Sequence, residues 1–207
     1  MIDPKPLAST AGYGEAADAL VEQYESVSFA DVHRDVLHLF PSQPSVILDI
    51  GAGSGRDAAA LAGQGHVVVA AEPTAELRAL GAQIHADRDI EWVDDSLPEM
   101  RVLRSRGQRF NLILLTAVWM HLDGQQRASA MEGIADMLAS EGRVVLSLRH
   151  GPVPAGRRMF KVSAHETIEL ARGHGLGVVH LSEREDPHGR QGVHWSYLGL
   201  VLETAVG

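Results

Sequence analysis

Residues 47–56 read ILDIGAGSGR, an apolar run that ends in an acid and turns into a glycine loop. Gly51, Gly53 and Gly55 stand at every second position, ahead of a helix that we expect to begin near residue 56. Glycines between a strand and a helix let a ligand approach the backbone. The dinucleotide fingerprint G-x-G-x-x-G would need a glycine where Arg56 stands, and no Gly-Lys-Ser/Thr follows as in a P-loop. The stretch therefore indicates a ligand-binding α/β unit of another kind.

Short apolar runs alternate with amphipathic segments beyond this loop. We expect strands at 46–50, 67–71, 90–93, 111–116, 143–149, 176–182 and 195–202, and helices near 56–63, 74–86, 125–139 and 163–174. Strands that alternate with helices predict an α/β fold with a doubly wound, seven-stranded and mostly parallel sheet, in which we expect the last strand to be antiparallel. Ligands of such sheets bind beyond the carboxyl ends of the strands.

The first 45 residues are predicted to be helical. Ser28 and Asp31 have the spacing of a capping box, and Pro41 and Pro44 end this helical part. A second capping box, Ser163 with Glu166, opens the last predicted helix. The length of 207 residues predicts a single domain over 1–207, with a helical N-terminal cap at 1–44 and the α/β core at 45–207.

The composition excludes several classes of function. The chain has no cysteine, which excludes disulfides, thiolate metal sites and cysteine nucleophiles, and its histidines other than His121 and His150 show no metal-ligand spacing. No apolar segment is long enough to cross a bilayer, and the N-terminal fifteen residues lack the apolar core of a signal peptide. We therefore expect a cytoplasmic protein without a metal or a membrane partner.

A net charge of −9 argues against binding of nucleic acid through an extended basic surface. One local exception is the basic run RVLRSRGQR, which carries Arg101, Arg104, Arg106 and Arg109. A solvated surface helix and loop is the simpler interpretation of this run, and a docking patch for an anionic partner is the alternative.

An acid follows the second predicted strand. Glu72 lies 21 residues beyond Gly51, and a carboxylate at this place can accept hydrogen bonds from both ribose hydroxyls of a bound nucleoside. The same charge would repel a 2′-phosphate. Together with the glycine loop, Glu72 predicts a nucleoside-containing ligand.

Four blocks in this order resemble the class I S-adenosylmethionine-dependent methyltransferases, which have a Rossmann-like fold. VILDIGAGSGRDAAALA resembles their first motif, VVVAAEP their ribose-binding acid, IEWVDDSLPEM their third strand, and NLILLTAVWMHL their fourth strand with its loop. LASEGRVVLSLR is similar to the entry of their fifth strand, although Glu141 and Arg143 depart from the usual pattern. The resemblance covers about residues 45–150, and more loosely the last two strands.

The resemblance implies a cofactor, S-adenosylmethionine, that becomes S-adenosylhomocysteine, and a role for each matching residue. Gly51, Ala52 and Gly53 would lie against its methionine part, and Asp49 would order the loop or bind the cofactor's ammonium group. Arg56 would reach the methionine carboxylate, or instead cap the helix or pair at the surface. The other implied contacts are Glu72 on the ribose, Pro73 beside the adenine, Asp95 or its neighbour Asp94 on the adenine amino group, Ser96 and Leu97 on the ring nitrogens, and Thr116 at the end of the fourth strand.

Two histidines follow the fourth and fifth strands, where the acceptor is expected. His121 either takes a proton from the acceptor or packs beneath the cofactor, and His150 either orients an anionic substrate with Arg149 or has a structural role in its loop. Tyr13 and Tyr24 belong to the N-terminal part, where this family often keeps a lid. Trp119 is a candidate for the pocket wall or for the core.

The resemblance implies a transferase of the methyltransferase class, EC 2.1.1.-. No Asn-Pro-Pro-Tyr-like segment follows the fourth strand, where methyltransferases that act on nucleic-acid amino groups carry one, and no cysteine is available to attack a pyrimidine. We expect methyl transfer to an oxygen or nitrogen of a small molecule. The alternatives are a nucleic-acid or protein methyltransferase, a non-catalytic partner of one, and, with less support, a NAD-dependent oxidoreductase. The sequence leaves the choice between monomer and homodimer open.

Overall fold

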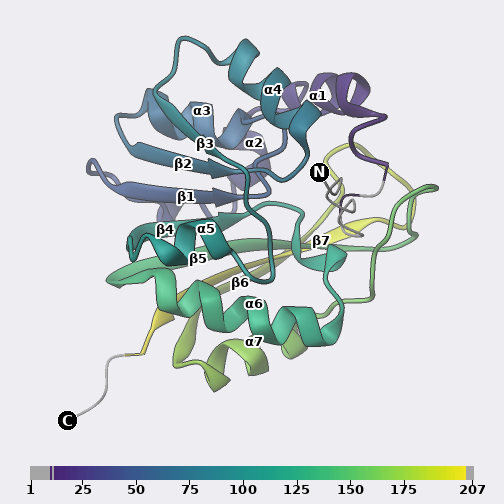
Figure 1. Ribbon diagram of the computed structural model, residues 1–207. Coiled ribbons are helices and arrows are strands. Elements are labelled where there is room, and N and C mark those ends of the chain that lie inside the picture. Colours follow the sequence, from purple (N-terminus) through teal and green to yellow (C-terminus); the bar gives the residue numbers. More distant parts are fainter. Residues whose placement is uncertain (1–9, 11, 204–207) are drawn as a thin grey trace, which may run out of the picture.

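The apolar runs form one seven-stranded sheet in the computed structural model, which describes residue 10 and residues 12–203 (Figure 1). The strands are β1 (Val46–Ile50), β2 (Val67–Ala71), β3 (Ile90–Val93), β4 (Phe110–Leu115), β5 (Leu138–His150), β6 (Leu176–Glu185) and β7 (His194–Leu202). Their order is β3-β2-β1-β4-β5-β7-β6, and β7 is antiparallel to both of its neighbours. The predicted fold class, a mostly parallel doubly wound sheet with an antiparallel last strand, is confirmed.

Helices cover both faces of the sheet. They are α1 (Ala17–Glu25), α2 (Phe29–His33), α3 (Arg56–Gly63), α4 (Ala75–Ile84), α5 (Arg101–Ser105), α6 (Gly124–Met137) and α7 (Ala164–Gly173), with 3-10 turns η2 (Leu37–Leu39) and η3 (Trp119–His121). Figure 1 shows α6 and α7 side by side across the sheet from α3, α4 and α1. The hydroxyl oxygens of Ser28 and Ser163 accept from the backbone N–H of Asp31 and Glu166, as the capping spacing predicts.

Two strands are longer than the sequence indicates. β5 follows α6 directly at Leu138, because Leu138 already pairs with Phe110 before the ladder shifts register and continues at Arg143. β6 runs three residues beyond Ser182, to Glu185, where it still pairs with His194 of β7. The added residues do not continue an apolar run, so the sequence does not predict them as strand. Their extended conformation is held by backbone pairing with a neighbouring strand.

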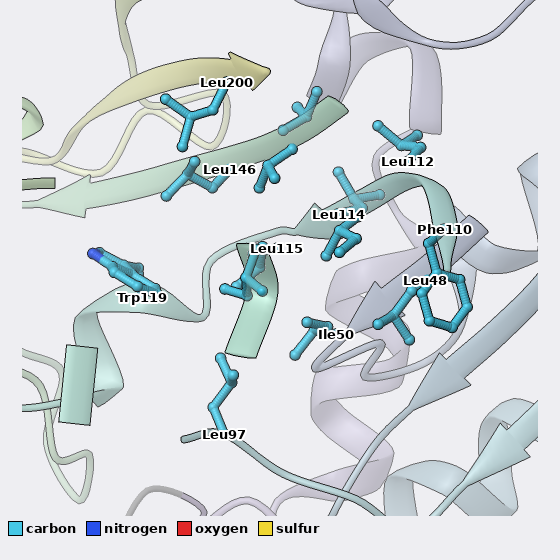
Figure 2. Close-up of a cluster of buried hydrophobic side chains, with 14 of the residues drawn as sticks. Leu48, Ile50, Leu97, Phe110, Leu112, Leu114, Leu115, Trp119, Leu146 and Leu200 are labelled. Atoms are coloured by element: carbon cyan, nitrogen blue, oxygen red, sulfur yellow. The ribbon is translucent and has the colours of Figure 1, made fainter. Parts of the chain in front are cut away.

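The core lies where the central strands meet the helices. β1 and β4 are adjacent and in register, with Ile47 opposite Leu112. Figure 2 shows Leu48, Phe110, Leu114 and Leu146 as part of one buried cluster. Burial on both faces explains why these strands are nearly continuous in apolar residues.

The sheet order reverses between β1 and β4, and the glycine loop lies at this switch point. Gly51 and Ala52 both donate their backbone N–H to the carbonyl oxygen of Ala71, at 2.8 and 3.1 Å, which ties the loop to the end of β2. Gly55 has a φ of 82°, and a Cβ atom there would stand 2.6 Å from the Trp92 ring. The third glycine of the motif is therefore required by the packing of α3 against β3.

Replacing Gly55 with alanine is expected to lower the free energy of unfolding by about 3 kcal/mol, because the left-handed backbone and the clash with Trp92 both oppose a side chain. Urea denaturation measures this loss. Gly65→Ala is the matched control, since Gly65 has a φ of 89° but no heavy atom within 4 Å of its Cβ position, so that only about 1 kcal/mol should be lost. Equal losses in the two variants would contradict the packing role.

Candidate active site

The carboxyl ends of the central strands open into one cavity of about 510 Å³. This is a size typical of small-molecule sites. Its lining contains the glycine loop after β1, residues that follow β2, β3 and β4, and Tyr13 and Tyr24 from the N-terminal part of the chain. Most of the predicted site residues line it: Asp49, Gly51, Ala52, Gly53, Arg56, Glu72, Pro73, Asp95, Ser96, Leu97, Thr116 and His121.

Glu72 joins two of the loops that form the cavity. One of its carboxylate oxygens accepts from the backbone N–H of Gly53 at 2.9 Å, and the other accepts from the N–H of Thr74 at 2.7 Å. Burial raises the pKa of this carboxyl group, although the two backbone donors oppose the rise. Each carboxylate oxygen can accept more than one hydrogen bond, so Glu72 retains acceptor capacity for a ligand's hydroxyl groups.

The two acids after β3 lie in different surroundings. The Asp95 carboxylate is buried and accepts from the backbone N–H groups of Ser96 and Leu103, both at 2.9 Å. Asp94 instead pairs with Arg78 at 3.0 Å, with 69% of its side chain exposed, and it is not among the lining residues. The geometry therefore favours Asp95 over Asp94 as the acid that faces a ligand.

Asp57 is the centre of a buried polar cluster beneath the glycine loop. Its carboxylate accepts from His33 Nε2 at 2.8 Å, from Arg56 Nε at 2.7 Å and from Thr116 Oγ1 at 2.8 Å. The neighbouring His33 and Arg56 outweigh the effect of burial and hold the pKa of Asp57 well below its usual range. The predicted site residues Arg56 and Thr116 thus meet on an acid that the sequence analysis did not single out.

Asp49 has the opposite environment. It is buried at the end of β1, and its Oδ2 atom has no hydrogen-bond partner in the part of the chain that the structure describes. Burial and the nearby Asp57 carboxylate raise the pKa of Asp49 well above its usual value. A buried carboxylate oxygen without a partner beside a cavity is suited to a cationic group of a ligand.

Arg56 is held by the protein itself. Besides its contact with Asp57, its Nη1 donates to the backbone oxygen of Tyr24 at 3.1 Å. This contact links the start of α3 to α1, and Tyr24 lies 3.2 Å from the Cβ position of Gly53. Arg56 lines the cavity, and its guanidinium group donates hydrogen bonds to Asp57 and to the Tyr24 backbone oxygen.

His121 and Tyr13 form a hydrogen-bonded pair in the cavity wall. His121 Nδ1 donates to the backbone oxygen of Arg158 at 2.9 Å, which leaves Nε2 to accept from the Tyr13 hydroxyl, also at 2.9 Å. Burial lowers the pKa of His121, and the positive charges of Arg157 and Arg149 act in the same direction. His121 is therefore a neutral imidazole near neutral pH with its basic nitrogen at the cavity.

His150 lies apart from this pair. Its Nε2 is 2.8 Å from Ser196 Oγ, and its ring stacks on His194 with the ring centroids 4.6 Å apart. It is not among the residues that line the cavity, whereas its neighbour Arg149 is. Trp119 belongs to the buried core (Figure 2).

Asp57 and His33 are the site residues that the sequence analysis missed. Asp57 follows Arg56 on the first turn of α3, and an acid at a helix N-terminus is too common to stand out. His33 lies 24 residues earlier, and only the packing of α2 on α3 brings it to Asp57.

Over residue 10 and residues 12–203, no group of three or more His, Cys, Asp or Glu side chains is arranged to hold a metal ion. None of the helices in these residues is long and apolar enough to span a membrane. The basic run is held by local partners, since Arg104 pairs with Asp136 at 2.9 Å and Arg106 with Glu91 at 2.6 Å. Arg109 donates to the backbone oxygen of Asp136.

A glycine loop and two buried acids around one cavity, at the switch point of this sheet, are the features of the family that the sequence resembles. The family model described as "Methyltransferase domain" matches residues 22–198, and the chain belongs to this family. The predicted enzyme class, a methyltransferase, is confirmed. Among curated proteins, none matches the sequence.

Solved structures share the fold at low sequence identity. A TehB-like SAM-dependent methyltransferase from Corynebacterium glutamicum has a TM-score of 0.68 and 22% identity, covering 91% of this chain and 99% of that one. The 1,6-didemethyltoxoflavin-N1-methyltransferase of Burkholderia thailandensis, with bound 1,6-didemethyltoxoflavin and S-adenosylhomocysteine, has a TM-score of 0.63 and 23% identity, covering 99% and 98%. The magnesium protoporphyrin IX methyltransferase of Synechocystis PCC 6803, with bound SAM, has a TM-score of 0.63 and 13% identity, covering 93% and 80%.

The Asp49→Asn variant is expected to be more stable than the wild-type protein at neutral pH. Because the pKa of Asp49 is raised on folding, its contribution to stability is present below its unfolded pKa near 4 and is lost as the pH rises toward the folded value. Asparagine keeps the shape without the charge, so its stability advantage should grow as the pH is raised from the unfolded pKa near 4 through neutral pH. Urea denaturation across this range measures it.

Asp89→Asn is the control, because Asp89 is exposed and should show no such growth. An Asp49→Asn protein that is less stable than wild type at the upper end of this range would refute the assignment.

Proposed function

We propose that this methyltransferase moves the methyl group of S-adenosylmethionine to an oxygen or nitrogen atom of a small molecule. The observation that carries the proposal is the continuous cavity that joins the Glu72-bound glycine loop to His121. When bound, the cofactor supplies a methyl group on a positively charged sulfur. The residues present fit such a ligand, since Asp49 holds a buried carboxylate oxygen without a partner among the described residues, and Glu72 and Asp95 add two further acids.

Each part of the cofactor has a proposed partner. Gly51, Ala52 and Gly53 lie against the methionine part, and the Asp49 carboxylate binds the ammonium group. The other proposed contacts are Glu72 on the ribose hydroxyls, Pro73 beside the adenine, Asp95 on the adenine amino group, and the backbone groups of Ser96 and Leu97 on the ring nitrogens. Arg56 and Thr116 act on this site through Asp57, to which both donate hydrogen bonds.

The other half of the cavity positions the acceptor for an in-line displacement. With the cofactor held by Asp49, Glu72 and Asp95, its sulfonium group would supply the methyl group for the acceptor's oxygen or nitrogen. The acceptor's proton passes to the Tyr13 hydroxyl oxygen as the Tyr13 hydroxyl proton passes to His121 Nε2, 2.9 Å away. The hydrogen bond from Nδ1 to the Arg158 carbonyl keeps Nε2 unprotonated and basic. Holding the reactants in line in a site closed to water is the main task of the protein. We assign no catalytic role to His150, which lies outside the cavity wall.

A small acceptor is favoured over a macromolecule by the state of the basic run. Arg104 and Arg106 are paired with acids of the same molecule, so they do not form an open basic surface. The Burkholderia thailandensis protein, whose structure carries 1,6-didemethyltoxoflavin, is a precedent for a small acceptor on this fold.

Glu72→Ala is expected to weaken the binding of S-adenosylhomocysteine by about tenfold or more, because the ribose hydroxyls lose a charged hydrogen-bond partner. Calorimetric titration of the purified protein measures this. Glu132→Ala on α6 is the matched control, since Glu132 is exposed and lies outside the cavity wall. Unchanged affinity in a folded Glu72→Ala protein would remove the ribose assignment.

His121→Gln is expected to reduce the rate of methyl transfer by about a hundredfold for an acceptor that arrives protonated. The wild-type rate should fall on the acid side as the pH drops below about 6.5, because the pKa of His121 lies below its ordinary value and a protonated imidazole cannot accept a proton. This acid limb should disappear in the variant. Mass spectrometry of a panel of phenols, alcohols and amines, with S-adenosylhomocysteine release as the readout, tests both points.

His165→Gln provides the control, because His165 is exposed on α7. An acid limb that survives in His121→Gln would show that another group takes the proton.

A further inference from the structure

Apart from the ion pair of Arg56 with Asp57, the acids and arginines that line the cavity are divided between its two ends. The acids stand at the glycine-loop end, after β1, β2 and β3, as Asp49, Glu72 and Asp95. The end that follows β5 and the loops after it carries Arg149, Arg157 and Arg190 instead. A cationic cofactor accounts for the acidic end and leaves the basic end unexplained.

Arg149 is the most unusual of these arginines. Its side chain stands at the end of β5, the residue is 9% exposed, and Nη1 donates to the backbone oxygen of Pro152 at 2.8 Å. Its Nε atom is buried and has no hydrogen-bond partner among the described residues. A buried guanidinium donor without an acceptor is costly, and an anionic oxygen at the cavity would satisfy it.

The neighbours of Arg149 add to the positive charge. Burial lowers the pKa of Arg149, and the like charge of Arg190 lowers it further. Arg190 is bound by Asp186 at 2.6 Å, and the Asp186 carboxylate is also engaged by the indole N–H of Trp195. The guanidinium carbon of Arg157 lies 3.9 Å from the centre of the Tyr13 ring, which places this third charge next to the Tyr13–His121 pair.

We propose that the methyl acceptor carries an anionic group, a carboxylate or a phosphate, and that Arg149 binds this group with the help of Arg157 and Arg190. The anion is the anchor and a separate hydroxyl or amino group is the nucleophile, held toward Tyr13 and His121. Guanidinium groups suit both anions because their N–H donors match two oxygens at once. The proposal rests on the proposed function, since it names the class of acceptor for the same cavity.

The first measurement separates the two proposals. Calorimetry with S-adenosylhomocysteine tests the cofactor site alone, and absence of binding would refute the proposed function. The second measurement uses the protein saturated with S-adenosylhomocysteine and compares three probes that share one ring: 4-hydroxybenzoate, 4-hydroxyphenyl phosphate and the neutral 4-hydroxybenzamide. We expect at least one anionic probe to bind about tenfold more tightly than the amide, and the two anions show which group the site prefers.

Variants assign the preference to its residues. Arg149→Gln should reduce the preference for the anionic probe to near unity, and Arg157→Gln, in a half-buried position where folding is less at risk, should reduce it in part. Arg172→Gln is the matched control, because Arg172 is 60% exposed on α7, pairs with Glu169 and does not line the cavity. Circular dichroism reports whether each variant is folded. If Arg149→Gln does not fold, the loss of preference in Arg157→Gln tests the proposal.

Three outcomes would overturn the proposal. The first is that the anionic probes bind no better than the amide, or that none of the probes binds. The second is that the preference persists in both arginine variants. The third is that the variants weaken S-adenosylhomocysteine but not 5′-methylthioadenosine, which lacks the amino-acid part, because the arginines would then bind the cofactor's own carboxylate.

Discussion

The Asp57 carboxylate joins three parts of the chain that are far apart in sequence. Its donors come from the last residue of α2, the first residue of α3 and the residue after β4. A buried carboxylate is tolerated only while its donors stay in place, so these three elements are fixed relative to one another. The glycine loop ends at α3, and α2 follows α1, which carries Tyr24, after the non-helical residues 26–28. The geometry of the cavity floor therefore depends on this hydrogen-bonded cluster, of which Arg56, Asp57 and Thr116 line the cavity.

The opposite charges at the two ends of the cavity would orient charged ligands along it. Asp49 and Glu72 place carboxylates where the sheet order reverses, and Arg149 places a guanidinium group at the end of β5. A cation and an anion bound at these ends would approach each other with the reacting atoms between them. Because both ends are formed by loops on one rigid sheet edge, the distance between the two binding regions is set by the spacing of β1, β4 and β5.

The sequence is informative where a feature depends on neighbours along the chain. Ser28 and Ser163 cap their helices, the apolar runs form the strands, and Glu72 stands beside the glycine loop, because local spacing determines each of these. Asp94 and Asp95 show the limit: adjacent side chains leave a strand end in opposite directions, and only the fold decides which of the two is buried.

Contacts between distant segments leave no pattern in a single sequence. The pairing of His33 with Asp57 spans 24 residues, and that of Tyr13 with His121 spans 108. The additional length of β5 and β6 likewise comes from pairing with neighbouring strands. Sequence alone could therefore define the cofactor end of the cavity better than the acceptor end, which is assembled from the N-terminal segment and from loops after β5 and β6.

The three tryptophans of the chain occupy three different environments. Trp92 packs behind the glycine loop against Gly55 and Gly81, Trp119 is enclosed in the core, and Trp195 lines the cavity at its basic end, bonded to Asp186. The protein thus contains its own optical probes. The emission of Trp195 is placed to respond to an acceptor, and that of Trp92 to changes in the glycine loop. Trp119, fully buried in the core, is placed to report its unfolding.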